Sequence, residues 1–281
     1  MAQVIDAAAI ASSSVDPTAS PYWKVVTSWD CAGIANADGA DRPAGSTCQN
    51  TMWTGNGRPS VLEDINGEVR QIPQGTIEID GRTLTWEQVN NQTWTDAQVA
   101  TMVADNETST KADRAPSGYY VFKNAIGLLT YTPASPAIRK QLWQQLAKVP
   151  GVTFDGRATD ALGRSGWRLT WGSQDAGQES IIIDTTTGMP LEQSDQAAGV
   201  KTPNVTTIVS AGPADSAPAA PSAKELRQQK LAQARACGII PQSVSESASA
   251  RQQLRPVRMP HLTKKQQSCL NSGEGTLASV N

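Results

Sequence analysis

The stretch Trp167–Ile183, WRLTWGSQDAGQESIII, decides the fold class. Apolar residues alternate with polar ones from Trp167 to Trp171, a pattern typical of a strand with one buried face. Ile181–Ile183 is a short apolar run, which indicates a more fully buried strand. The same alternation recurs near the start of the chain in Trp23–Trp29. Short, half-buried strands therefore dominate the expected fold.

Tight-turn dipeptides separate these strands from about residue 22 to residue 209. Four of them stand out: Asn56-Gly57, Asn66-Gly67, Asp80-Gly81 and Asp155-Gly156. Both central positions of a type I′ turn need a positive φ, so each dipeptide predicts a hairpin. The pattern predicts one strand before the Asp80-Gly81 turn, with Ile77 and Ile79 on its buried face, and one after the turn, with Leu84 and Trp86 on its buried face. Successive turn-linked strands favour an antiparallel meander over βαβ units.

Helical periodicity is rarer. Ser135–Val149 predicts a helix, with Pro136 at its first position and an apolar residue at every fourth position. Thr95–Val103 and Val4–Ala11 predict shorter helices. We therefore expect an α+β fold, a curved antiparallel meander sheet with about two helices on one side.

Composition divides the chain into three parts. Residues 1–210 form the expected main domain, and the Pro- and Ala-rich segment 211–223 indicates an extended linker. The cysteine-bearing tail, 224–281, contains a helix candidate at Lys224–Cys237 but too few large apolar residues for a core of its own. A disulfide between the two cysteines of the tail would tie it into a helical hairpin, and a largely disordered tail is the alternative.

The charge and the catalytic residue types limit the function. The chain of 281 residues has 24 Lys+Arg and 26 Asp+Glu, a net charge of -2, which argues against a nucleic-acid partner. His261 is the single histidine, so histidine-dependent catalysis and multi-histidine metal sites have little basis. The sequence has no nucleophile elbow, and no carboxylate spacing selects a glycosidase-type pair. We predict a non-enzymatic protein without catalytic residues, metal site or cofactor.

Four cysteines indicate the compartment: Cys31, Cys48, Cys237 and Cys269. They form no C-x-x-C motif and have no zinc-like spacing, so metal ligation is a poor interpretation. An even count favours disulfides in an oxidising compartment, and four reduced cytosolic thiols are the alternative. Loop length favours the pairs Cys31–Cys48 and Cys237–Cys269, although the sequence leaves other pairings open. Since no apolar run could span a bilayer and no secretory signal follows Met1, an export or anchoring segment would lie outside this chain.

Tryptophan is unusually frequent, with eight Trp against two Phe and four Tyr. Six of them fall on predicted strands: Trp23, Trp29, Trp53, Trp86, Trp167 and Trp171. An indole has an apolar body and one polar N–H, so it can line a ligand cavity or fill a core. We expect these six to line a mainly apolar cavity of roughly a few hundred Å³ on the concave face of the sheet. The alternative is that they provide core volume beneath the helices.

The ordered motifs resemble a known family. Leu84–Gln88 (LTWEQ), followed by Thr95–Ala97 (TDA), is similar to a passage in actinobacterial membrane-anchored extracytoplasmic proteins commonly encoded beside extracytoplasmic-function sigma factors. The match is best over about residues 80–195 and continues through these segments: Ile126–Leu129, Pro136–Arg139, Pro150–Val152, Thr159-Asp160, Gly163-Arg164, Ile183-Asp184 and Thr187-Gly188. The family's membrane helix is absent from this chain, and the cysteine-bearing segments are not part of the family pattern.

The resemblance implies an open half-barrel similar to lipoprotein carriers and to periplasmic sigma-regulatory sensors, with helices on its concave side. It implies an extracytoplasmic location in the cell envelope, membrane-anchored through the absent segment, or secretion. The implied function is a non-enzymatic sensor or regulatory domain linked to a sigma factor, with a regulatory protein as partner. The alternative is a carrier of an apolar small molecule such as a lipid. The resemblance carries over no catalytic residue.

Overall fold

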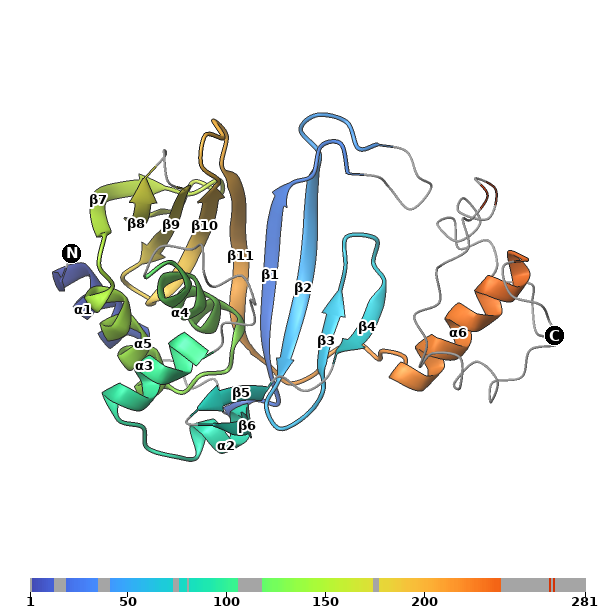
Figure 1. Ribbon diagram of the computed structural model, residues 1–281, viewed down its shortest axis with the longest axis horizontal. Coiled ribbons are helices and arrows are strands. Elements are labelled where there is room, and N and C mark those ends of the chain that lie inside the picture. The colour runs from blue at the N-terminus through green and yellow to red at the C-terminus, as the bar shows by residue number, and fades with distance from the viewer. Residues whose placement is uncertain are drawn as a thin grey trace. The chain divides into compact units, whose positions relative to one another are not determined.

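The computed structural model describes residues 2–12, 19–34, 41–72, 76–79, 81–105, 118–173, 177–238, 263 and 265. The chain forms two compact units. The first consists of Met1–Asp30 and Thr47–Ala219, and the second of Cys31–Ser46 and Ala220–Asn281. All the strands belong to the first unit (Figure 1).

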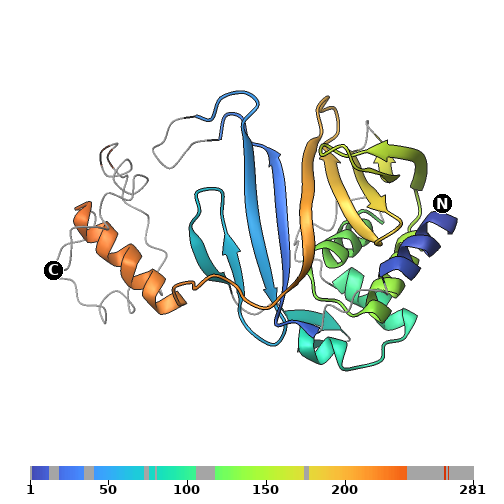
Figure 2. The same cartoon turned by 180° about the vertical axis from the view of Figure 1, so that it is seen from behind.

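Nine strands form one open antiparallel sheet in the order β4-β3-β2-β1-β11-β10-β9-β8-β7, which confirms the expected fold class (Figures 1 and 2). Their bounds are β1 Tyr22–Asp30, β2 Thr47–Gly55, β3 Ser60–Glu63, β4 Val69–Ile72, β7 Val152–Thr159, β8 Ser165–Ser173, β9 Gly177–Asp184, β10 Met189–Gln196 and β11 Asn204–Ala214. The strands β5 (Thr76–Ile79) and β6 (Arg82–Thr85) form a separate hairpin. Within β1–β4 and within β7–β11, each strand pairs with the next one along the chain, as a meander requires. The pairing of β1 with β11 joins these two groups of strands.

Turn chemistry predicted three of the four hairpins correctly. Gly57, Gly67 and Gly81 have positive φ and lie between β2 and β3, β3 and β4, and β5 and β6. The prediction of a turn at Asp155-Gly156 was wrong. Gly156 has a φ of 93° but lies inside β7, where the register with β8 shifts between Phe154 and Gly156. A β-bulge of the G1 type uses a glycine with positive φ, as a type I′ turn does, so the dipeptide alone does not distinguish the two.

The position of Trp86 also differs from the prediction. It is the first residue of a short helix, α2 (Trp86–Asn90), rather than the end of a strand. The side chain of Thr85 accepts from the backbone N–H of Gln88, and the side chain of Gln88 accepts from the backbone N–H of Thr85. This reciprocal capping box starts a helix directly after β6. The T-x-x-Q spacing was the sequence signal for it.

Four longer helices accompany the large sheet: α1 (Ala2–Ser12), α3 (Asp96–Asp105), α4 (Tyr119–Tyr131) and α5 (Pro136–Lys148). The predictions for α1, α3 and α5 are confirmed, whereas the pattern did not predict α4. Helix α4 contacts β1, β8, β9 and β10, and α5 packs against α4, α1 and α3 (Figure 1). The layer therefore has more helices than the expected two, but α4 is the one that packs extensively on the large sheet, while α1 and α3 pack against α5.

The main hydrophobic core lies between these helices and the sheet. Side chains from both layers are almost completely buried in it, among them Ile5, Met102, Leu129, Leu142 and Ile181. In the pairing of β8 with β9, Leu169 lies opposite Ile181 and Trp167 lies opposite Ile183. Leu169, Ile181 and Ile183 belong to the main core, so the predicted buried face of the Trp167–Ile183 stretch is the one that faces the helices.

The second unit contains α6 (Ala223–Ala236), which matches the helix expected over Lys224–Cys237. Ser222 and Glu225 form a capping box at its start. The segment assigned to the linker begins later than expected, because β11 continues through Gly212 and Pro213 to Ala214. Most of the tail after residue 238 lies outside the described residues.

Candidate functional site

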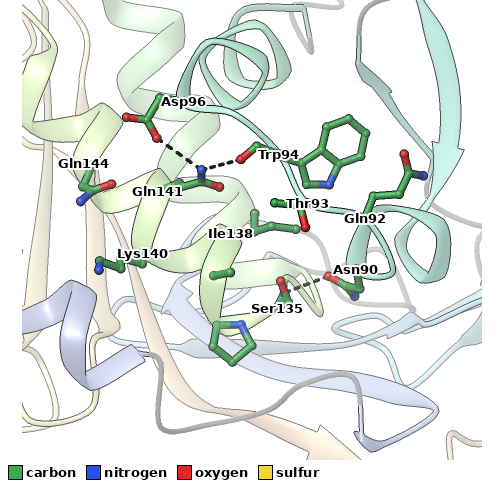
Figure 3. A pocket seen from close by; sticks show the side chains of 12 residues that line it. Asn90, Gln92, Thr93, Trp94, Asp96, Ser135, Ile138, Lys140, Gln141 and Gln144 are labelled. Carbon is green, nitrogen blue, oxygen red and sulfur yellow. Dashed lines mark hydrogen bonds between the residues drawn. The ribbon is translucent and has the colours of Figure 1, made fainter.

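A pocket of about 650 Å³ opens between the α2–α3 connection and the first turns of α5 (Figure 3). Its wall contains neutral polar side chains, a tryptophan and one charge of each sign. The lining residues are Asn90, Gln92, Thr93, Trp94, Asp96, Ser135, Pro136, Ala137, Ile138, Lys140, Gln141 and Gln144.

Asn90 anchors one side of the pocket. Its Nδ2 donates to the carbonyl oxygen of Pro133 at 2.8 Å, and its Oδ1 accepts from the backbone N–H of Ser135 at 2.9 Å (Figure 3). Both polar atoms of the amide are therefore used to hold the end of α2 against the start of α5. Ser135 precedes α5, with Pro136 in the first turn, but its hydroxyl makes no capping hydrogen bond to the helix.

The opposite side is held by amides on α5. Gln141 Nε2 donates to the carbonyl oxygen of Trp94 at 2.8 Å and to Oδ1 of Asp96 at 3.3 Å (Figure 3). Gln145 Nε2 donates to the carbonyl oxygen of Asp96 at 3.1 Å, and Lys148 Nζ lies 3.7 Å from Oδ2 of Asp96. These contacts fix the start of α3 along α5 and partly neutralise Asp96.

Trp94 borders the pocket but is only 6% exposed and belongs to the main core. Its indole N–H donates to the carbonyl oxygen of Val89 at 2.8 Å, and the guanidinium carbon of Arg82 lies 5.6 Å from its ring centre. The side chains of Thr93, Gln144 and Lys140 make no hydrogen bond or ion pair with another described residue. The pocket thus combines an apolar wall with polar groups that are still available to a ligand.

The six tryptophans predicted to line a ligand site lie elsewhere. Trp86 and Trp171 belong to the main core, and the indole N–H of Trp171 donates to the carbonyl oxygen of Pro150 at 3.0 Å. Trp23 is also buried, and its N–H donates to the carbonyl oxygen of Thr130 at 2.9 Å. All three fill space in the core, and the N–H groups of Trp23 and Trp171 satisfy backbone carbonyls.

The other three differ in environment. Trp53 is buried and lies opposite Lys24 in the register of β1 with β2, so it faces away from Trp23. Trp29 and Trp167 are half-buried, and Trp167 packs against Phe154, with a ring-centre distance of 5.3 Å. None of the six lines the pocket of Figure 3. Their role in binding an apolar ligand stays a prediction.

Cys31, Cys48 and Cys237 are all disulfide-bonded, and none of the described cysteines is a free thiol. This state confirms that the cysteines are oxidised. Cys269 lies outside the described residues, and the pairing favoured by loop length stays a prediction.

Side chains satisfy every carbonyl at the corner between α4 and α5. The seven consecutive carbonyl oxygens from Leu128 to Ala134 each accept a hydrogen bond from a side chain. Arg139 donates to those of Leu129, Thr132 and Ala134. The other four donors are Thr132 to Leu128, Trp23 to Thr130, Thr54 to Tyr131 and Asn90 to Pro133. The last carbonyls of a helix lack partners within the helix, and Pro133 has no N–H to offer. The corner between the two helices therefore depends on side chains from α2, α5 and the sheet.

Arg139 is the centre of this corner. It is 1% exposed and donates to the carbonyl oxygens of Leu129, Thr132 and Ala134 at 2.8, 3.2 and 3.2 Å. Its guanidinium carbon lies 4.6 Å from the ring centre of Trp23. Burial lowers the pKa of Arg139 to about 10. Its contacts identify it as a structural cation, and this role explains the Arg within the Pro136–Arg139 motif.

A second buried charge lies between α4 and the sheet. Glu179 on β9 accepts from the hydroxyl of Tyr119 at 3.2 Å and lies 3.5 Å from Lys123 Nζ. Burial is the main cause that raises the pKa of Glu179, with Asp195 adding to it and Lys123 opposing it. Tyr119 also packs against Trp171, so the cluster joins the start of α4 to the sheet.

Asp160 and Arg164 pin the β7–β8 hairpin to the sheet. Oδ1 of Asp160 accepts from the backbone N–H groups of Leu162 and Arg164 at 3.0 and 2.7 Å, and Oδ2 accepts from Arg164 Nε at 2.6 Å. Arg164 Nη2 then donates to the carbonyl oxygens of Leu191 and Ile208. The Asp160 and Arg164 motifs of the family resemblance thus have a structural explanation.

The described part of the chain contains no cluster of His, Cys, Asp and Glu that could hold a metal ion. Among the described helices, none is both long and apolar enough to cross a membrane.

Three similar solved structures are distant neighbours of the chain. No protein-family model and no curated protein matches the chain. Similar solved structures include MucB in complex with MucA(peri), the MucA/MucB complex of Pseudomonas aeruginosa, and MucB alone. Sequence identities are 12%, 13% and 12%, and TM-scores are 0.30, 0.30 and 0.27. Each comparison covers 80% of this chain, which spans 58%, 60% and 61% of those chains.

Proposed function

We propose that this chain is a non-enzymatic sensor or regulatory domain on the outer side of an actinobacterial membrane, linked to a sigma factor through a regulatory protein partner. In this proposal the domain is held at the membrane by a further segment of the protein. It acts by binding, and the signal passes inward through the anchoring segment.

The oxidised state of the cysteines carries the proposal. Disulfides persist in oxidising compartments and are rare in the cytosol of most organisms. Cys31, Cys48 and Cys237 are all disulfide-bonded, which fits a domain that works outside the cytoplasm. The link to a sigma factor comes from the family resemblance of residues 80–195, whose Arg139 and Asp160 motifs have structural roles in this fold.

The positions of the charged groups support binding rather than catalysis. Arg139 and Arg164 are committed to backbone carbonyls, and Asp160 is committed to its own hairpin. Each of these strong hydrogen-bonding groups stabilises a corner or a turn. The carrier alternative has less support, because Trp23, Trp86 and Trp171 are packed into the core and the described pocket is lined largely by polar side chains.

The test is a transcription assay in the native host. A reporter gene under the adjacent sigma factor is compared between cells with the intact full-length gene and cells in which residues 1–281 are replaced by an unrelated disulfide-bonded domain. We expect reporter activity to change when this domain is replaced and to return on complementation with the intact gene.

Unchanged reporter activity would remove the regulatory proposal. If, in addition, the purified chain carried co-purified lipid, the carrier alternative would replace it.

A further inference from the structure

We propose that the pocket between the α2–α3 connection and α5 is a binding site for a neutral saccharide. The idea that this saccharide is the signal sensed by the regulatory domain rests on the proposed function. Binding itself depends only on the pocket and is measured on the purified chain.

The size of the pocket fits a small ligand. Its volume of about 650 Å³ lies within the range of roughly 300–1,000 Å³ that is usual for small-molecule sites. The walls are held rigidly: Asn90 fixes the start of α5, and Gln141 fixes the loop at Trp94. A site with supported walls loses little conformational entropy when a ligand binds.

The polar groups of the pocket select a ligand rich in hydroxyls. Thr93 and Gln144 offer a hydroxyl and an amide, and the hydroxyl of Ser135 is not used to cap α5. Gln92 offers its Oε1, because its Nε2 donates to the carbonyl oxygen of Gln88 at 3.0 Å. An amide side chain both donates and accepts, and so does a hydroxyl. A saccharide matches such groups because each of its hydroxyls is also a donor and an acceptor. An aliphatic ligand would leave them buried without hydrogen-bond partners, which disfavours its binding.

Apolar surface and charge complete the argument. Pro136 and Ala137 provide the accessible apolar part of the wall against which the C–H face of a sugar ring can pack, since Trp94 and Ile138 are only 6% and 1% exposed. Asp96 is occupied by Gln141 and Lys148, which leaves Lys140 as the charge that is not paired within the described residues. One flexible lysine does not define an anion site, so a neutral ligand fits the balance of groups best.

The experiment titrates the purified, disulfide-intact chain with maltotriose, cellotriose and triacetylchitotriose, followed by isothermal titration calorimetry and by the indole N–H resonance of Trp94. We expect saturable binding of at least one trisaccharide in the millimolar range, with a shift of that resonance. Thr93→Val and Gln144→Ala should each weaken binding about fivefold, the loss of one hydrogen bond. Gln71→Ala is the matched control on β4, an exposed glutamine outside the pocket, and should leave affinity unchanged.

Three outcomes would overturn the inference. Absence of saturable binding to all three saccharides would reject a neutral saccharide ligand. Binding that survives both pocket variants would place the site elsewhere. A loss of binding on Lys140→Met together with competition by inorganic phosphate would show that the pocket takes an anion. The sigma-factor reporter is read separately, so failure here leaves the regulatory proposal intact, and failure of the reporter leaves saccharide binding intact.

Discussion

Replacement of Arg139 by methionine tests the corner between α4 and α5. Methionine keeps much of the buried stem of the arginine but removes its donors, so three buried carbonyl oxygens lose their partners. Each unpaired acceptor costs about 1–3 kcal/mol, and the contact with Trp23 adds about 1 kcal/mol. The variant also avoids burying a charge. Burial lowers the pKa of Arg139 from its ordinary value to about 10, and removal of this buried charge therefore relieves about 3 kcal/mol.

With about 2 kcal/mol for each of the three carbonyls, the sum predicts that Arg139→Met lowers the free energy of unfolding by about 4 kcal/mol. Arg139→Lys should be no better tolerated, because one ammonium cannot reach three carbonyls in different directions. Urea unfolding of the disulfide-intact chain, followed by circular dichroism and tryptophan fluorescence, measures both. Lys140→Met is the control, since Lys140 is the exposed neighbour on the same helix and should change stability by less than about 0.5 kcal/mol. A lysine variant as stable as the wild type would refute the argument from donor geometry.

Three further predictions concern other buried groups. The pKa of Glu179 is raised on folding, so this carboxyl favours the folded state at low pH and disfavours it as pH rises from the ordinary glutamate range through the raised pKa. Glu179→Gln should therefore gain stability over the wild type across that window in urea melts, and parallel pH profiles would contradict this. Asp160→Asn should lower the free energy of unfolding by about 2 kcal/mol, because the charged acceptor of three hydrogen bonds is lost; an unchanged urea midpoint would show that the hairpin holds without it. Alkylation of the denatured, unreduced chain followed by mass spectrometry should find no free thiol, and the detection of two or more would remove the physical basis for an extracytoplasmic location.

The local signals in the sequence were informative where a short segment decides its own conformation. Helix α5 begins at Pro136 and ends before Pro150-Gly151, as its pattern predicts. The Asn-Gly turns at Gly57 and Gly67 form hairpins, since positive φ there costs glycine little. Asp155-Gly156 shows the limit of such signals, because a bulge and a turn share one backbone requirement.

Helix α4 shows why the rest could not be predicted locally. The segment Tyr119–Tyr131 is rich in aromatic and β-branched residues and contains Gly127, which together favour a strand as much as a helix. Its helical state is stabilised by burial of Phe122, Ile126 and Leu129 in the core. Propensity is a weak guide when tertiary packing supplies most of the stability of a helix.

The candidate site was missed for a similar reason. Sequence reasoning directed attention to the strand tryptophans, but the pocket is lined by polar residues from three segments that meet only in the folded chain. The signals that could have located its edges are the T-x-x-Q capping boxes at Thr85–Gln88 and Thr95–Gln98. They mark the starts of α2 and α3, between which one wall of the pocket lies.

The sequence by itself determined the α+β class, the antiparallel meander and most of the turns, because these depend on periodicity and local backbone chemistry. Its even cysteine count favoured disulfides but left reduced thiols as an alternative. Only the tertiary structure decided that β1 pairs with β11, that α4 is a helix, and that Arg139 with Trp23 and Thr54 completes the hydrogen bonding at its end. The partners in each case are far apart in the chain. Their meeting depends on the burial of a shared apolar face and on the need to pair every buried carbonyl, and neither can be read from one segment alone.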